Sequence, residues 1–171
     1  MSGEKTSDDE LFKSVIGMRT SKSTVVIERG PVTFFAEAVL EASPAYRSPE
    51  AAKAIGLEDI PAPPTYPLVM EHWGKFPELQ PKDAPDAGVA AQAMGKLMSG
   101  PGLILHGEQE YTYYRPVVVG DVLVGEGTVV DAYRKESKGR TMTFLITETR
   151  WTDQRTGEPV VTSRFNVVHR S

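Results

Sequence analysis

The sequence contains no cysteine, and this absence excludes several kinds of protein at once. Without thiols there is no disulfide framework, no cysteine nucleophile and no thiolate metal site. No apolar run approaches the length of a membrane-spanning helix, and the first ten residues lack the hydrophobic core of a signal peptide. We therefore expect a cytoplasmic protein with no membrane as partner.

Basic charge is also scarce, because 19 lysines and arginines stand against 23 aspartates and glutamates, for a net charge of −4. This balance argues against a nucleic acid as partner. The three histidines, His72, His106 and His169, are isolated and lack nearby paired carboxylates, so we predict no metal site. The sequence has neither a glycine-rich dinucleotide fingerprint nor a nucleophile elbow, and we predict no separate cofactor.

The length and composition are typical of one globular domain. The 171 residues are enough for a full hydrophobic core, with a hydrophobic share of 40% and a charged share of 25%. We see no internal repeat and no domain boundary. The sequence therefore predicts a single domain over residues 1–171, with residues 1–7 as a disordered lead-in.

The most apolar predicted helix covers residues 31–42. Pro31 follows Gly30 at a position that suits the first turn of a helix, and Ser43-Pro44 ends the pattern because the residue before proline avoids the α region. Apolar side chains recur at helical spacing between these limits, at Phe35, Ala38, Val39 and Ala42. We expect this helix to be mainly buried and to need a sheet curved around it.

Most of the remaining sequence is typical of strands. Short helices are predicted at residues 8–16 and 48–55, an extended proline-rich segment at 60–67, a helical turn at 68–73, an exposed loop at 76–87 and a second longer helix at 88–98. Strands are predicted at 23–28, 103–115, 121–135, 140–151 and 160–170. The order predicts an α+β fold in which an antiparallel sheet wraps around the helix at 31–42.

Several segments resemble a known family. Residues 115–123, Arg-Pro-Val-Val-Val-Gly-Asp-Val-Leu, resemble the R-P-V-x-x-G-D-x-L turn of MaoC-like hydratases and dehydratases. Residues 43–46, 49–52 and 60–67 are similar to the N-P-x-Y…P-x-A-A…I-x-A-P-P-T-F pattern of the MaoC dehydratase N-terminal group, also called FAS1-like dehydratase domains. Residues 105–110 are also similar to that group, so the resemblance covers nearly the whole chain.

The resemblance implies a hot-dog fold that handles acyl thioesters, with coenzyme A or acyl carrier protein as part of the substrate. Active members of the family carry an aspartate and a histidine in a D-x-N-P-x-H pattern. Here Glu41 stands at the aspartate position, Ser43 at the asparagine position and Tyr46 at the histidine position. A tyrosine, with a pKa near 10, is a poor general base. Candidate substrate-binding residues are Tyr46, Pro64, Thr65, Tyr66 and His106.

Three functions follow from this departure. The leading hypothesis is a subunit of an enoyl-thioester hydratase or (3R)-hydroxyacyl-thioester dehydratase that binds the acyl chain and pairs with a catalytic MaoC-like subunit, as a heterodimer or heterotetramer. A second is a self-sufficient homodimeric hydratase or thioesterase that uses Glu41 or His106. A third is a non-catalytic acyl-CoA-binding protein. No catalytic residue is assigned in this chain on the sequence alone.

Overall fold

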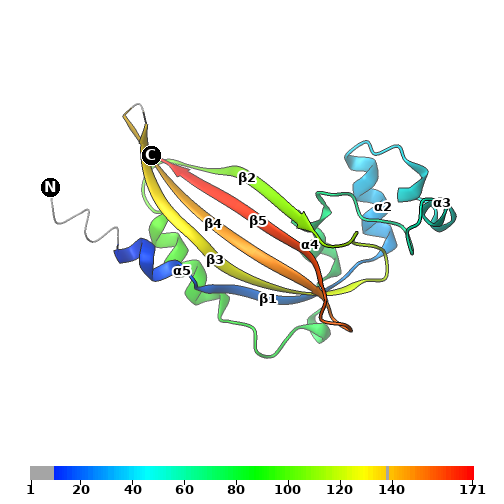
Figure 1. Cartoon of the computed structure of the whole chain (residues 1–171). Coiled ribbons are helices and arrows are strands. Elements are labelled where there is room, and N and C mark those ends of the chain that lie inside the picture. The colour runs from blue at the N-terminus through cyan, green and yellow to red at the C-terminus, as the bar shows by residue number, and fades with distance from the viewer. Residues whose placement is uncertain (1–9, 138) are drawn as a thin grey trace.

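The computed structural model describes residues 10–137 and 139–171 (Figure 1). The predicted lead-in at residues 1–7 lies outside the described residues, as does Lys138. Residues 10–15 are helical. The elements that follow are β1 (Arg19–Val26), α2 (Arg29–Ala38), η1 (Pro44–Tyr46), α3 (Pro49–Ala54), η2 (Tyr66–Leu68), α4 (Met70–Gly74), η3 (Pro77–Leu79), α5 (Ala87–Leu97), β2 (Leu103–Tyr113), β3 (Val122–Ser137), β4 (Arg140–Asp153) and β5 (Pro159–Arg170).

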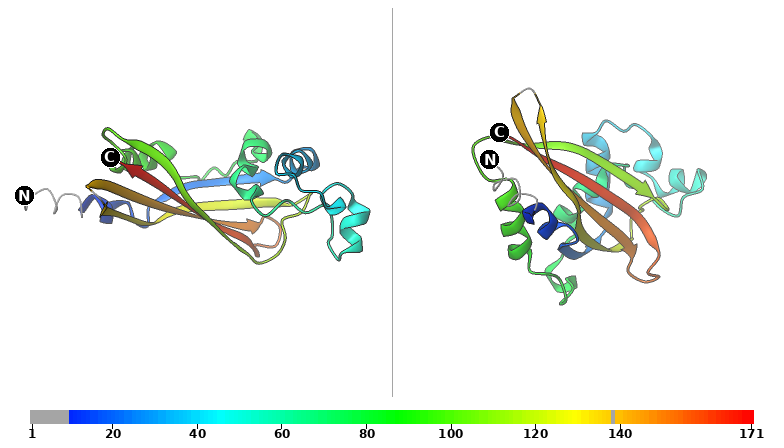
Figure 2. Two further views of the ribbon diagram at one scale, coloured as in Figure 1. Left: turned by 90° about the horizontal axis from the view of Figure 1, so that it is seen from above. Right: turned by 60° about the vertical axis from the view of Figure 1, so that its left-hand side comes forward.

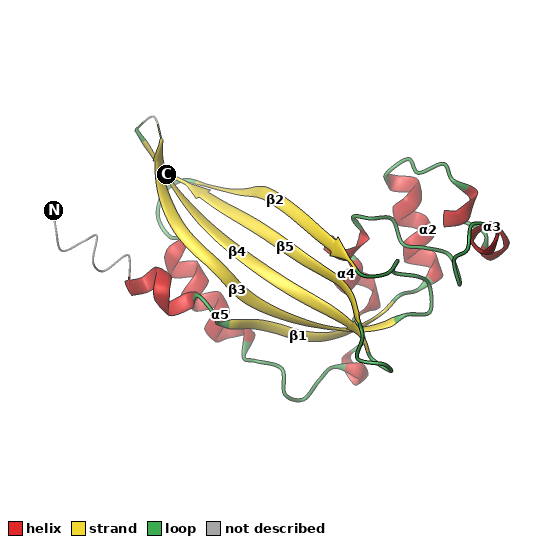
Figure 3. Ribbon diagram, viewed as in Figure 1, coloured by secondary structure: helices red, strands yellow, loops and turns green. Residues whose placement is uncertain are grey.

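The strands form one antiparallel sheet in the order β1-β3-β4-β5-β2. The four long strands begin and end close to their predicted limits. β1 begins earlier than predicted, at Arg19. The sheet is strongly twisted, and α2, α4 and α5 lie toward one of its faces (Figures 2 and 3). The predicted α+β hot-dog architecture is confirmed.

The core lies under this face in two clusters. The larger one joins β1, α2, α4 and the ends of β3–β5, and contains Val25, Ile27, Val32, Ile60, Tyr66, Met70, Val117, Leu123, Trp151, Val160 and Val161. The other lies where residues 10–15 and α5 cover the far half of the sheet, and contains Phe12, Val15, Leu97, Val129, Ala132 and Leu145. The two-residue alternation of the strands contributes to both clusters, although the adjacent Val160 and Val161 are both buried.

The predicted length and extent of burial of the helix at residues 31–42 are wrong. The observed helix, α2, ends at Ala38, and only Val32 and Ala36 of its residues are buried. It lies at one end of the sheet, on the same side as α4 and α5, rather than along the middle of the sheet (Figures 1 and 2). Phe34 is 64% exposed, and the two predicted helical residues that follow α2, Val39 and Leu40, are 47% and 88% exposed. Burial in the core therefore does not explain why Phe34, Val39 and Leu40 are apolar.

The helix ends early because Leu40 adopts a left-handed backbone conformation, with φ of 58°. The Glu41 N–H then donates to the Ala36 carbonyl at 2.8 Å and the Leu40 N–H to the Glu37 carbonyl at 3.0 Å. This is a Schellman motif, which glycine usually permits. Leucine at this position gives no sequence signal for a helix end, which explains the error.

Helices α4 and α5 cover the sheet instead. Gly74, at the end of α4, lies so close to β1 that a Cβ atom there would collide with the Val26 carbonyl oxygen. Glycine at this position lets the backbones of α4 and β1 approach. All helices among the described residues are too short or too polar to cross a membrane.

Candidate functional site

A cavity of about 680 Å³ lies between the segment after α2 and the end of β2. We call it the tyrosine cavity. Its lining is largely apolar and comes from four separate stretches of chain: Glu41, Ser43, Ala45, Tyr46, Ile55, Leu57, Pro61, Ala62, Pro64, Tyr113, Tyr114, Arg115, Pro116 and Val117. An apolar hollow with a few polar groups is the usual form of a small-molecule site.

Glu41 and Tyr46, the two positions of the altered dyad, both line this cavity. The Ser43 N–H donates to Glu41 Oε1 at 3.1 Å, and Arg47 Nη1 donates to the Glu41 carbonyl at 2.9 Å. Burial raises the pKa of the Tyr46 phenol, and the Glu41 carboxylate raises it further. Tyr46 therefore keeps its proton at neutral pH and can donate a hydrogen bond, but it cannot act as a base.

The proline-rich segment forms a second wall. Pro61 pairs with Val118 in an isolated bridge, and the Ala62 N–H donates to the Val117 carbonyl at 2.8 Å. The Tyr113 hydroxyl donates to the Pro64 carbonyl at 2.7 Å and so joins this wall to β2. Burial raises the pKa of Tyr113, with a further contribution from neighbouring tyrosines. Tyr113 is thus a second protonated phenol at the cavity.

Ion pairs hold in place the part of the cavity lining that surrounds Arg115. The Arg115 guanidinium binds Asp121 through two hydrogen bonds, of 2.7 and 3.0 Å, and binds Asp153 at 3.0 Å. Asp121 also accepts from the Val118 N–H at 2.9 Å, which closes the turn. Gly120, with φ of 93°, supplies the left-handed residue that the turn needs. Two carboxylates neutralise the charge of Arg115. The turn therefore stabilises the cavity lining and offers no unpaired cation to a ligand.

The structure does not bring every predicted substrate-binding residue to this cavity. Pro64 lines it, but Thr65 and Tyr66 do not. Tyr66 is 1% exposed and packs edge-on against Phe35. Burial raises the pKa of Tyr66 to about 12, with a smaller contribution from Glu28. Tyr66 is therefore a core residue.

His106 also lies away from the cavity. It is exposed on β2, and its ring centre is 4.7 Å from that of Phe165. Seven residues separate it from Tyr113, which corresponds to roughly 20 Å along a strand at about 3.3 Å per residue. Glu41 and His106 therefore cannot act on the same water molecule.

Sequence reasoning missed several lining residues. Ile55, Leu57, Tyr113 and Tyr114 line the cavity, yet the sequence analysis assigns none of them to the site. The sequence does contain one signal for Tyr113 and Tyr114, which is their position directly before the Arg115-Pro116 turn. No comparable signal marks Ile55 and Leu57, which directly follow α3 and reach the cavity because α3 packs against η1.

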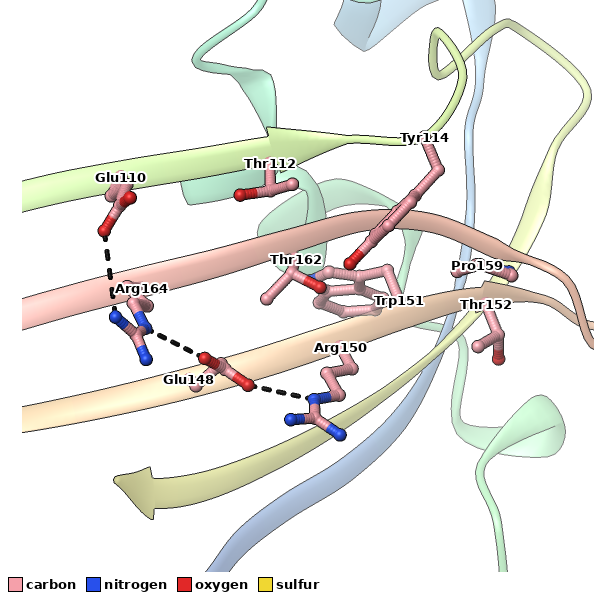
Figure 4. A pocket seen from close by; sticks show the side chains of 10 residues that line it. All are labelled: Glu110, Thr112, Tyr114, Glu148, Arg150, Trp151, Thr152, Pro159, Thr162 and Arg164. Atoms are coloured by element: carbon pink, nitrogen blue, oxygen red, sulfur yellow. Dashed lines mark hydrogen bonds and ion pairs between the residues drawn. The ribbon is translucent and has the colours of Figure 1, made fainter. Parts of the chain in front are cut away.

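A second cavity, of about 590 Å³, lies over β2, β4 and β5 and is lined by charged side chains (Figure 4). The Glu148 carboxylate accepts from Arg150 Nε and from Arg164 Nε, each at 2.9 Å. Burial opposes ionisation of Glu148, but the two arginines outweigh it and hold its pKa below the usual value. Two glutamates and two arginines compensate one another there, so this cavity presents no net charge to a ligand.

Chemically, the tyrosine cavity can hold an apolar group and donate hydrogen bonds to it, and its lining includes one carboxylate and no histidine. Among residues 10–137 and 139–171, no cluster of three or more histidines and carboxylates could hold a metal ion. The lining therefore combines one carboxylate, that of Glu41, with phenols and apolar side chains.

Comparison with known proteins places this geometry in context. The family model described as "FAS1-like, dehydratase domain region" matches residues 14–163. A UPF0336 protein of Saccharopolyspora erythraea is 33% identical over 144 residues, which cover 84% of this chain and 81% of that protein. A UPF0336 protein of Thermobifida fusca is 32% identical over 146 residues, which cover 84% and 83%.

Solved structures share the fold at low sequence identity. The ChsH1-ChsH2 complex from Mycobacterium tuberculosis contains a chain with a TM-score of 0.71 and 19% identity, covering 96% of this chain and 91% of that one. The HadBC (3R-hydroxyacyl-ACP dehydratase) complex from the same organism gives a TM-score of 0.65 and 19% identity, covering 90% and 96%. The (R)-hydratase from A. caviae gives 0.53 and 20%, covering 89% and 94%.

Proposed function

Because the chain belongs to the FAS1-like dehydratase domain family, we propose that it is a subunit of an enoyl-thioester hydratase or (3R)-hydroxyacyl-thioester dehydratase. Its tyrosine cavity binds the acyl part of the substrate, and a MaoC-like partner subunit supplies the aspartate and histidine. Coenzyme A or acyl carrier protein enters as part of the substrate, without a separate cofactor. We place this activity in the cytoplasm, the compartment that the sequence analysis predicts.

The observation that carries this proposal is the composition of the cavity beside residues 41–46. Hydration of an enoyl thioester needs one group to take a proton from water while another donates a proton. The lining offers the Glu41 carboxylate together with tyrosines, and burial keeps Tyr46 and Tyr113 protonated. The cavity therefore offers at most one of the two groups that hydration needs, the Glu41 carboxylate, while its lining remains largely apolar.

The need for a partner has independent support. Two solved structures with the same fold are named as complexes of two components, HadBC and ChsH1-ChsH2. The first of these is also named as a (3R)-hydroxyacyl-ACP dehydratase. A heteromeric dehydratase built from chains of this fold is therefore a reasonable model for this protein.

One alternative also has an observation in its favour, because Glu41 does line the cavity. A self-sufficient hydratase or thioesterase could use its carboxylate as the base. In that case Glu41→Gln should abolish turnover by the isolated chain. His106→Ala tests the other form of this alternative in the same way.

Binding is tested by titrating the isolated chain with crotonyl-CoA and a longer enoyl-CoA, by calorimetry. Ile55→Asn makes the cavity wall polar at a residue that is already 66% exposed, so the fold should tolerate it. We expect a loss of affinity of about tenfold, from the apolar contact removed. Val89→Asn, at an equally aliphatic residue 59% exposed on α5 and away from the cavity, is the matched control and should bind normally.

Turnover is tested with the same ligands. We expect the isolated chain to bind them yet hydrate crotonyl-CoA very slowly, with no further loss in Glu41→Gln. Rapid hydration by the isolated chain would contradict the partner requirement. Absence of any acyl-CoA binding would contradict the assignment of the cavity.

The partner is tested by co-expression with an adjacent reading frame that encodes a D-x-N-P-x-H segment. We expect the two chains to purify together and to hydrate the enoyl thioester. Binding without turnover in the presence of every such partner would favour the non-catalytic acyl-CoA-binding protein instead.

A further inference from the structure

The covered face of the sheet carries polar side chains between its two core clusters. On β4, Leu145 belongs to the smaller cluster and Trp151 to the larger one. Thr147 and Thr149 lie between them on the same face, because every second residue of a strand points to one side. Ser163 of β5 lies directly opposite Thr149. The two clusters are therefore separated by a row of hydroxyl groups.

A cavity of about 150 Å³ lies over these hydroxyl groups, between the sheet and α4, and we call it the polar cavity. Its polar lining includes Glu71, Gln109, Tyr111, Thr147, Thr149 and Ser163. Because one water molecule occupies roughly 30 Å³ in the liquid, this volume holds a group of about five non-hydrogen atoms. The polar cavity can therefore receive a small molecule or one end of a larger one.

Trp151 brings a buried donor to this cavity. Its side chain is 2% exposed, and its Nε1 is buried without a hydrogen-bond partner in the described part of the chain. The six-membered ring of its indole lies against Gly125 of β3, where a Cβ atom would collide with that ring. Nε1 is on the opposite edge of the indole, and therefore faces away from β3 toward the strands that line the cavity. An indole nitrogen can only donate, so the group that pairs with it must be an acceptor.

A second side chain of the lining is also left with its donor. The Tyr111 hydroxyl donates to Gln109 Oε1 at 2.7 Å, which leaves the amide nitrogen of Gln109 to donate elsewhere. The hydroxyl groups of Thr149 and Ser163 can donate as well. An oxygen with free lone pairs is the acceptor that fits this set of donors.

The charges of the lining are already paired. Arg164 is the one cation among the described residues that line the cavity, and its Nε binds Glu148 on the opposite face of the sheet. The Glu71 carboxylate lies 3.5 Å from Lys75 Nζ. A carboxylate or phosphate would meet Glu71 without an unpaired cation to neutralise it, which is unfavourable. The fitting acceptor is therefore a neutral oxygen, a carbonyl or a hydroxyl.

The polar cavity adjoins the tyrosine cavity. Tyr111 lines the first and Tyr113 the second, and their ring centres are 6.3 Å apart. The proline-rich segment is shared in the same way, since Pro64 lines the tyrosine cavity and Pro67 the polar cavity. Both cavities thus lie along the same two segments of chain, and one extended ligand can occupy both.

We propose that the polar cavity binds a ketone or hydroxyl oxygen on the acyl group whose apolar part occupies the tyrosine cavity. Trp151 Nε1 donates to this oxygen, and Thr149 and Ser163 surround it. A purely hydrocarbon end would leave the buried indole N–H without a partner, which disfavours such a ligand. This inference rests on the proposed function for the thioester, and it adds the substrate class: an acyl group that carries a neutral oxygen away from its thioester.

The polar cavity is tested first without a thioester. Methyl propyl ketone, which has about the size of the cavity, is titrated into the isotope-labelled isolated chain, and nuclear magnetic resonance follows the two indole N–H signals. The variant Trp73→Phe assigns them. We expect the Trp151 signal to move downfield as its N–H donates, and the Trp73 signal to stay in place, because Trp73 does not line this cavity.

Thr149→Val tests the hydroxyl groups, because it removes one of them and keeps the shape of the side chain. We expect the ketone to bind about threefold to tenfold more weakly. The matched control is Thr162→Val, the same change at a half-buried threonine on the opposite face of β5, and it should bind normally. Trp151→Phe removes the indole donor. Far-ultraviolet circular dichroism confirms its fold, and Thr149→Val alone serves if that variant does not fold.

The substrate class is tested with pairs of medium-chain enoyl-CoA thioesters of equal length. One member of each pair carries a ketone at a stated carbon of the chain, and the other is purely alkyl. Calorimetry on the isolated chain should show about tenfold tighter binding for the ketone member of at least one pair. Thr149→Val should reduce this preference while leaving the affinity for the alkyl member unchanged.

Two results would overturn the proposal. One is a Trp151 signal that does not respond to the ketone, or that responds equally in Thr149→Val. The other is equal affinity for both members of every thioester pair. If no thioester binds at all, the proposed function fails, and the ketone titration decides the polar cavity by itself. The two failures are therefore distinguishable.

Discussion

The two edge strands of the sheet, β1 and β2, differ in whether another segment of the chain covers them. At β1, the loop after α4 folds back along the strand, and Gln80 bonds both backbone groups of Thr24: its Oε1 accepts from the Thr24 N–H at 3.2 Å and its Nε2 donates to the Thr24 carbonyl at 3.0 Å. Lys22 adds an ion pair to Asp83 of the same loop, at 2.7 Å. At β2, no segment of the described chain takes this place.

The contrast concerns the hydrogen bonds of the outward-facing backbone groups on each edge strand. Gln80 gives Thr24 the two hydrogen bonds that a neighbouring strand would give, so β1 is closed within the chain. An unpaired edge invites association, and natural proteins normally cover or disrupt it. The two edges therefore differ in what satisfies their outward backbone groups: Gln80 does so at Thr24 of β1, and no segment of the described chain does so along β2.

The largest expected effect comes from opening the β1 edge with Gln80→Ala. This change leaves the Thr24 backbone groups, on a residue that is 1% exposed, without their partner, and also removes the Gln80 bond to the Phe76 carbonyl at 2.7 Å. We expect a loss of about 2–3 kcal/mol in the free energy of unfolding, measured with urea. Gln92→Ala on the exposed side of α5 should cost less than about 0.5 kcal/mol. Equal effects would show that Gln80 does not close this edge.

Hydrogen exchange of backbone amides should show the contrast directly. In the isolated chain, we expect the Thr24 amide to exchange at least about tenfold more slowly than the outward-facing amides of β2, which are not covered. Equal exchange at both edges would contradict the comparison.

The smallest effect concerns pH. The hydrogen bond from Lys22 is the main reason that the pKa of Asp83 lies below its usual value. The stabilisation from this pair is therefore complete above the unfolded pKa of about 3.9 and is lost as the pH falls through the lower folded value. Urea midpoints of the unmodified chain and Asp83→Asn should differ at about pH 6, and the difference should shrink progressively as the pH falls below about 3.9. A difference that does not depend on pH would rule out this contribution.

The strands of this protein were predictable because their signal is local. Alternating side chains and turn residues predicted the four long strands within a few residues, and the turn at residues 115–121 has the hydrogen bonds that its Arg, Gly and Asp suggest. The end of α2 was not predictable in the same way. A left-handed leucine at position 40 has no local sequence signal, and its conformation depends on how the following segment turns toward the cavity.

The candidate site was predictable in part, for a related reason. The replacement of the dyad by Glu41 and Tyr46 is visible in the sequence, and the structure places both at one cavity. Thr65 and Tyr66 come from the same motif as Pro64, yet Tyr66 is buried in the core, because the chain turns after Pro64 and Tyr66 begins the 3₁₀ helix η2. Tyr113 lies far from that motif in sequence and meets it only in three dimensions, through its hydrogen bond to the Pro64 carbonyl.

By itself, the sequence determined the strands, the charged turn and the loss of the histidine from the dyad segment, since each depends on neighbours within a few residues. The tertiary structure decided which helices cover the sheet, which side chains enclose the tyrosine cavity and which edge is closed. These depend on contacts between distant segments, such as Gln80 with Thr24 and Tyr113 with Pro64. A contact of this kind forms only when the packing of the whole domain brings both partners together.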